Sequence, residues 1–137
     1  MGQNLDPALP DTGDFDAVVL TLVGVNGAGA TITNLRHCAP GYDQRQEVVG
    51  HRRVLSTDNV RPTTVRRSTS EVTDAQDPYL DFFLTRYEQA YTHELNEFVA
   101  AVSEGRMPSP GIEDGVQALR LAEAAERSAR TGTVLTL

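Results

Sequence analysis

Residues 17–35 read AVVLTLVGVNGAGATITNL and decide the fold class. Residues 17–23 are apolar or β-branched at odd and even positions alike, which is typical of a strand covered on both faces. Asn26-Gly27 then supplies a tight turn, and residues 28–35 have the composition of a second strand. The stretch therefore predicts a β-hairpin of two antiparallel strands.

The sequence on either side of this hairpin is less regular. Residues 1–14 are rich in Pro, Gly, Asp and Asn without periodicity, so we expect a flexible lead-in there. Further short strands are expected within residues 42–49, 51–56 and 63–68. Residues 133–137 predict a short terminal strand.

Two helices are expected in the second half of the chain. The first runs from about residue 78 or 81 to Glu104, where Gly105 ends it. It carries one apolar stripe at intervals of three and four, formed by Leu84, Tyr87, Tyr91, Leu95, Phe98 and Val102.

The second helix is expected to start with Ser109 as the N-cap and Pro110 at the first helical position. It continues to about Arg130, and Gly132 follows its end. Its small residues share one face that allows close packing on a sheet or on another helix: Gly111, Gly115, Ala118, Ala122, Ala125 and Ala129.

The order of these elements indicates an α+β fold. Strands come first and helices last, without a strand–helix–strand rhythm, so we expect an open, largely antiparallel sheet with two main helices packed on one face. Residues 15–137 would form this single domain. No glycine-rich GxGxxG turn opens a helix after a strand, because Gly24, Gly27 and Gly29 lie in the predicted hairpin.

Composition and charge exclude several classes of partner. The chain has 137 residues, a net charge of −7, and 12 basic residues that are all Arg. Residues 36–67 hold seven of these Arg, but an acidic protein attracts phosphate backbones weakly, so we expect no nucleic-acid partner. No apolar run approaches the roughly 18 residues that cross a bilayer, and no signal-peptide pattern opens the sequence, so a cytoplasmic location without a membrane partner is expected.

Metal and thiol chemistry have weak support. His37, His51 and His93 show no ligand spacing with one another or with carboxylates, so no metal site is expected. The single Cys38 cannot form an internal disulfide. His93 lies near Glu94 and Glu97 off the apolar stripe, which indicates a solvated helix face.

The densest polar constellation is Tyr42-Asp43-Gln44-Arg45 beside the Pro40-Gly41 turn. It offers a phenol, a carboxylate, an amide and a guanidinium that can bind a carboxylate with two hydrogen bonds. Taken alone, the constellation fits either an Asp–Arg pair beside an edge tyrosine or a binding site for a polar ligand.

Several motifs follow one another in a fixed order along the chain. They are TITNLR at 31–36, GYDQRQEVVG at 41–50, RPTTV at 61–65, FLTRY at 83–87, PSPG at 108–111 and LAEAA at 121–125. Together they resemble the C-terminal domain of inositol 2-dehydrogenases, within the Gfo/Idh/MocA family of oxidoreductases. The resemblance covers about residues 14–137.

The resemblance implies one part of a two-domain enzyme. In this family a Rossmann domain binds NAD(P), and the α+β domain that follows it floors the substrate pocket and contributes to oligomer interfaces. The family's glycine-rich fingerprint, its Glu-Lys-Pro motif and its Asp–His helix have no counterpart in these residues, which contain no Lys at all. We expect no catalytic residue and no bound cofactor in this chain alone.

The resemblance also implies a substrate site. The hydroxyl of Tyr42 would hydrogen-bond a polyol or sugar, and Asp43 and Arg45 would hold Tyr42 in place. Tyr87 is a further candidate, although its position in the apolar stripe also suits a core residue.

Two functions follow as hypotheses. In the first, the chain is the substrate-binding and oligomerisation domain of an inositol 2-dehydrogenase-like enzyme, with a homo-oligomer formed through the exposed sheet face. A separate polypeptide could then supply the Rossmann domain. In the second, the chain is a stand-alone, non-catalytic polyol-binding or sugar-binding module, or an assembly module, derived from that domain.

Overall fold

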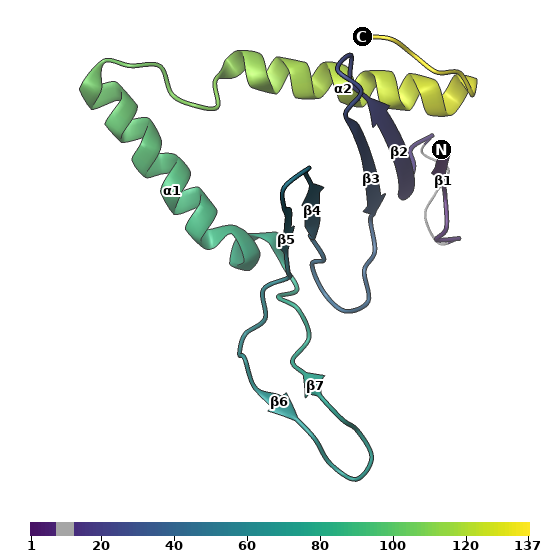
Figure 1. Ribbon diagram of the computed structural model, residues 1–137, viewed down its shortest axis with the longest axis vertical. Coiled ribbons are helices and arrows are strands. Elements are labelled where there is room, and N and C mark those ends of the chain that lie inside the picture. Colours follow the sequence, from purple (N-terminus) through teal and green to yellow (C-terminus); the bar gives the residue numbers. More distant parts are fainter. Residues whose placement is uncertain (8–12) are drawn as a thin grey trace. The chain divides into compact units, whose positions relative to one another are not determined.

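The computed structural model describes residues 1–7 and 13–137. The described elements are β1 (Gly2–Gln3), β2 (Ala17–Val23), β3 (Gly29–Leu35), β4 (Gln46–Val49), β5 (Val54–Thr57), β6 (Arg66–Arg67), β7 (Ala75–Gln76), α1 (Phe83–Glu104) and α2 (Ile112–Thr131) (Figure 1). All strand pairs are antiparallel, in three sheets of order β1-β2-β3, β4-β5 and β6-β7. The α+β class with antiparallel strands and two main helices is confirmed.

The chain divides into two compact units. The first comprises Met1–His37 and Met107–Leu137, and the second comprises Cys38–Arg106. The first unit therefore holds β1, β2, β3 and α2, and the second holds the remaining strands and α1.

The predicted hairpin is confirmed in the first unit. β2 pairs with β3 along its whole length, from Ala17 opposite Leu35 to Val23 opposite Gly29. Gly27, with φ +80°, turns the chain between the two strands. β1 adds a third strand beside β2, so the expected lead-in contains a short paired segment.

The expectation that residues 17–23 are covered on both faces is wrong for the described residues. Val18, Leu20 and Leu22 are half-buried, whereas Val19 and Val23 on the opposite face are exposed. One helix covers one face of a hairpin, so the second face is left to solvent.

α2 lies across β2 and β3 (Figure 1) and presents its small residues to them. A cavity of about 340 Å³ remains between helix and strands. Its apolar lining comes from Val18, Leu20 and Ile32 on the strands and from Ala118, Leu121, Ala122, Ala125 and Ala129 on the helix.

The predicted start of the second helix is wrong by two residues. Gly111 is the N-cap, and its backbone N–H donates to Oδ2 of Asp114 at 2.7 Å, so Ser109 and Pro110 precede the helix. Gly132 ends it in the left-handed region, as expected. The predicted terminal strand is also wrong, because residues 133–137 pair with no described strand.

The second unit consists of two hairpins and α1. Gly50 donates its N–H to the carbonyl of Arg53 at 2.9 Å and closes the turn between β4 and β5. The strand predicted over residues 51–56 therefore begins only at Val54, because its first residues form the turn. β6 and β7 form a two-residue ladder in a long ribbon that projects from the β4–β5 hairpin (Figure 1).

α1 begins at Phe83, two residues after the later of the two predicted starts. It ends at Glu104, and Gly105 follows in the left-handed region with φ +66°, as predicted. The apolar stripe is largely exposed, with Leu95 66% and Val102 65% accessible. Neither described helix is long and apolar enough to cross a membrane.

Very little of the described chain is fully buried. Ala101, Ala124 and Asp16 are the buried residues, and the accessible surface totals 11641 Å². Two separate compact bodies of the same total mass would expose about 8,500 Å² together. The surface therefore exceeds that of two compact bodies, and many large hydrophobic side chains are exposed on it.

Candidate functional site

The site with the densest chemistry is the Tyr42 turn, residues 41–45 in the second unit. Gly41 has φ +121°, and a Cβ atom there would lie 2.7 Å from the carbonyl oxygen of Tyr79. The N–H of Tyr42 donates to the carbonyl of Leu80 at 2.8 Å, and the N–H of Tyr79 donates to the carbonyl of Pro40 at 3.0 Å. The close approach of these two segments requires glycine at position 41.

Asp43 lies at the centre of a hydrogen-bond cluster. Its Oδ1 accepts from Nε of Arg45 at 2.9 Å and its Oδ2 accepts from Nη2 of Arg45 at 2.8 Å. Nδ2 of Asn59 also donates to Oδ1 at 2.5 Å. These bonds, first from Arg45 and then from Asn59, hold the pKa of Asp43 below its usual value.

Three tyrosines form an aromatic row beside this cluster. The ring centroids of Tyr42 and Tyr87 are 5.6 Å apart at 85°, and those of Tyr87 and Tyr91 are 6.2 Å apart at 72°. Both are edge-to-face arrangements, which aromatic pairs favour. Burial, then the neighbouring phenol of Tyr42 and a hydrogen bond with it, raise the pKa of Tyr87.

The structure therefore brings together all four residues named from the sequence. Tyr42, Asp43 and Arg45 share one turn, and Tyr87 reaches Tyr42 from α1. Tyr42 is 37% exposed, so its ring contacts Tyr87 while part of its side chain remains accessible. A phenol held in this way can exchange hydrogen bonds with a hydroxylated ligand.

Sequence reasoning missed Asn59 and the stacking of Arg61. The guanidinium of Arg61 lies 4.3 Å from the ring centroid of Tyr79 and also donates to the backbone carbonyl of Asp77. Asn59 is 16 residues from Asp43 in sequence, so no local pattern connects them. The signal for Asn59 lies in the β4–β5 register. Because Gln46 is opposite Thr57, continuing the register places Asn59 opposite Gln44.

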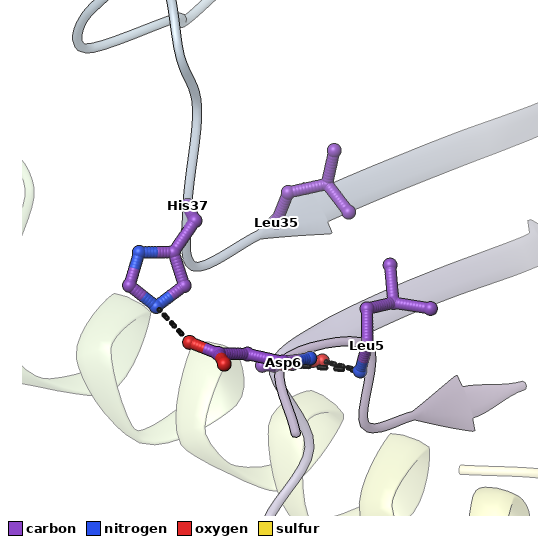
Figure 2. A pocket seen from close by; sticks show the side chains of 5 residues that line it. Leu5, Asp6, Leu35 and His37 are labelled. Atoms are coloured by element: carbon purple, nitrogen blue, oxygen red, sulfur yellow. Dashed lines mark hydrogen bonds and ion pairs between the residues drawn. The ribbon is translucent and has the colours of Figure 1, made fainter. Parts of the chain in front are cut away.

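A second polar site lies in the first unit (Figure 2). The buried carboxylate of Asp16 accepts from the backbone N–H groups of Leu5 at 2.8 Å and Asp6 at 2.8 Å, and these bonds lower its pKa. Nε2 of His37 lies 3.4 Å from Oδ2 of Asp6. Together with Leu35, these residues line a pocket of about 290 Å³.

The other candidates from the sequence form no further site. Glu97 forms an ion pair with Arg106, whose Nη1 lies 2.5 Å from Oε1 of Glu97. Cys38 is a half-buried free thiol. Among residues 1–7 and 13–137, no three His, Cys, Asp or Glu side chains gather as a possible metal site.

Comparison with known proteins identifies the relatives of this chain. Residues 7–137 match the Gfo/Idh/MocA domain described as "Oxidoreductase family, C-terminal alpha/beta domain". The chain belongs to this family. It therefore carries the C-terminal domain of an inositol dehydrogenase-like oxidoreductase, as the motifs indicated.

Three relatives illustrate the extent of the similarity. The chain is 40% identical to the inositol 2-dehydrogenase of Rhizobium meliloti and 42% identical to the myo-inositol 2-dehydrogenase of Thermotoga maritima. In both cases 90% of this chain is covered, but only 37% of the relative. The crystal structure of a myo-inositol dehydrogenase from Corynebacterium glutamicum superposes with a TM-score of 0.95 and 45% identity, over 99% of this chain and 41% of that protein.

This oxidoreductase domain spans about two fifths of the length of these relatives. Its described residues do not form the glycine-rich turn that opens a helix in dinucleotide-binding domains. Gly24 and Gly27 lie between two paired strands, not between a strand and a helix, and the N-terminus of α2 is already capped by Asp114.

Proposed function

We propose that this chain is the substrate-binding and oligomerisation domain of an inositol 2-dehydrogenase-like, NAD(P)-dependent oxidoreductase and does not transfer hydride by itself. The observation that carries the proposal is the contact between Tyr42 and Tyr87 beside the braced Asp43–Arg45 pair. The similarity to three inositol dehydrogenases supports the choice of an inositol as substrate.

The chemistry of the site suits a polyol. The Tyr42 hydroxyl can donate one hydrogen bond and accept others, which matches the mixed donor and acceptor character of a ring of hydroxyl groups. The accessible aromatic surface of Tyr42 suits the C–H groups of such a ring. Asp43 and Arg45 neutralise one another, so they brace the turn internally without adding net charge to a site for a neutral ligand.

A chimeric enzyme tests this proposal. The chain replaces the matched 41% of the Corynebacterium glutamicum myo-inositol dehydrogenase, with which it shares its fold. We expect NAD⁺-dependent oxidation of myo-inositol, followed by NADH absorbance. Tyr42→Phe should raise KM for inositol by about fivefold to tenfold through the loss of one hydrogen bond, and KM for NAD⁺ should not change.

The isolated chain provides the matching control. We expect it to reduce no NAD⁺ with myo-inositol present, because the described residues offer no site for the dinucleotide. A folded chimera that oxidises no inositol, or a Tyr42→Phe variant with unchanged KM, would contradict the role of this site.

The oligomerisation part of the proposal rests on exposed apolar strands. Val48, Val49, Val54 and Leu55 on β4 and β5 are each more than half exposed. The accessible area exceeds that of two compact bodies by about 3,000 Å², several times the roughly 800 Å² that each partner buries in a standard interface. We expect a dimer or larger assembly by light scattering; a monodisperse monomer at high concentration would contradict it.

A further inference from the structure

Asn59 joins the Tyr42 turn to the rest of the second unit. It lies two residues beyond β5, where the β4–β5 ladder has ended, and its side chain is half-buried. Its neighbour Val60 accepts a backbone hydrogen bond from Leu80 at 3.1 Å, and Leu80 in turn accepts from Tyr42 at 2.8 Å. The segment that carries Asn59 is therefore hydrogen-bonded to Leu80, which is also the backbone partner of Tyr42.

Both ends of the Asn59 amide contact the turn. Its Oδ1 accepts from the backbone N–H of Gln44 at 2.7 Å, and its Nδ2 donates to Oδ1 of Asp43 at 2.5 Å. Asn59 stands opposite Gln44 in the extended register, so its side-chain oxygen takes the place of a ladder carbonyl. Asparagine carries its acceptor and its donor on two separate atoms, so it can bond Gln44 and Asp43 at the same time.

The ion pair between Asp43 and Arg45 cannot hold the Tyr42 turn in place of Asn59. Arg45 belongs to the same turn as Asp43, and its side chain is 65% exposed, so their ion pair can move with the turn as one body. A hydrogen bond fixes the turn relative to the tyrosine row only when its partner lies outside the turn. The backbone bond from Tyr42 to Leu80 is one such bond, and Asn59 adds two more at the residues directly after Tyr42.

We infer that Asn59 is a positioning residue for the ligand-binding tyrosine: by holding Asp43 and Gln44, it fixes the direction of the Tyr42 side chain toward Tyr87 and the polyol. This inference rests on the proposed function of Tyr42. Asn59 itself need not touch the ligand.

The first test uses the chimeric enzyme described above. We expect Asn59→Ala to raise KM for myo-inositol by about fivefold with a smaller change in kcat, because it removes two hydrogen bonds from the turn but no reacting group. In the Tyr42→Phe background the same substitution should change KM less than twofold, since the hydroxyl that it positions is gone. Asn96→Ala, a substitution of an exposed asparagine on α1, is the matched control.

Equal fold-changes in KM in the two backgrounds would overturn the inference, because Asn59 would then act independently of Tyr42. If Tyr42→Phe leaves KM unchanged, the proposed function fails instead, and a second measurement still tests the positioning role.

That measurement uses the chain with its four tyrosines labelled by fluorine, followed by NMR without substrate. Tyr42→Phe assigns the Tyr42 resonance. We expect Asn59→Ala to shift or broaden this resonance, and Asn96→Ala to leave it in place. If the alanine variant does not fold, Asn59→Asp replaces it. This substitution preserves the size and the acceptor oxygen but places a second carboxylate against Asp43, so it should also shift the Tyr42 resonance. An unchanged Tyr42 resonance in a folded Asn59 variant would overturn the inference.

Discussion

Two aspartates in the two units show different ways of fixing a turn. Asp16 is buried and accepts hydrogen bonds from the backbone N–H groups of Leu5 and Asp6. Asp43 is partly exposed and is held by the side chains of Arg45 and Asn59. Both carboxyl groups have a lowered pKa, but for different reasons.

The difference teaches what each site is suited for. Backbone donors are present whatever residues occupy positions 5 and 6, provided they are not proline, so Asp16 alone decides whether that contact forms. The Asp43 contact depends on two other side chains, so we expect substitutions there to shift Tyr42 without unfolding the unit. Such a turn suits the proposed ligand site.

The largest expected effect comes from breaking the Tyr42 turn at Gly41. Gly41→Ala forces a side chain into φ +121° and places its Cβ against the carbonyl of Tyr79, so the free energy of unfolding should fall by about 3 kcal/mol. Gly27→Ala, at φ +80° with nothing within 4 Å, should cost only about 1 kcal/mol. Urea denaturation of both variants measures the difference, and equal costs would show that the close approach to Tyr79 is unimportant.

A smaller effect is expected from replacing each aspartate by its amide. Asp16→Asn leaves one backbone donor facing an NH₂ group, so the amide protons of Leu5 and Asp6 should exchange with solvent about tenfold faster. Asp43→Asn should speed exchange at Gln44 and leave Leu5 unaffected, because the contacts lie in separate units. Hydrogen exchange followed by NMR measures the effect of each substitution. If either substitution speeds amide exchange in both units, the two contacts are not independent.

The smallest effect concerns pH and salt. A lowered folded-state pKa means that the stabilisation is complete above the ordinary value of 3.8 and is lost as pH falls through the lowered value. Salt at 1 M should raise the pKa of Asp43 toward 3.8, because its principal hydrogen-bond donor is the charged, exposed side chain of Arg45. The pKa of Asp16, set mainly by backbone N–H groups, should move less. Carboxyl NMR titrations at low and high salt compare the two, and equal salt dependence would contradict these causes.

Local patterns were sufficient for much of the fold. The Asn26-Gly27 turn and the apolar stripe of α1 both depend on residues close in sequence, and both predictions are confirmed. The end of each helix was also predicted, because Gly105 and Gly132 adopt the left-handed conformation that glycine favours.

The remaining errors and omissions have non-local causes. Coverage of β2 depends on what packs against each of its faces, and the sequence of β2 contains no such information. Residues 133–137 have strand composition but no partner strand, and composition alone does not make a ladder. In the site, the Tyr42 motif was evident, whereas the bracing by Asn59 appears only once the β4–β5 register is known.

The unusually large accessible surface has a consequence for how the chain unfolds. The unfolding free energy falls with denaturant concentration in proportion to the surface area that unfolding exposes. Because 11641 Å² is already accessible, unfolding of this chain exposes only about three quarters of the area that two compact bodies of the same mass would expose. Its unfolding transition should therefore be broad, and a protein surface that covers the apolar strands should sharpen it.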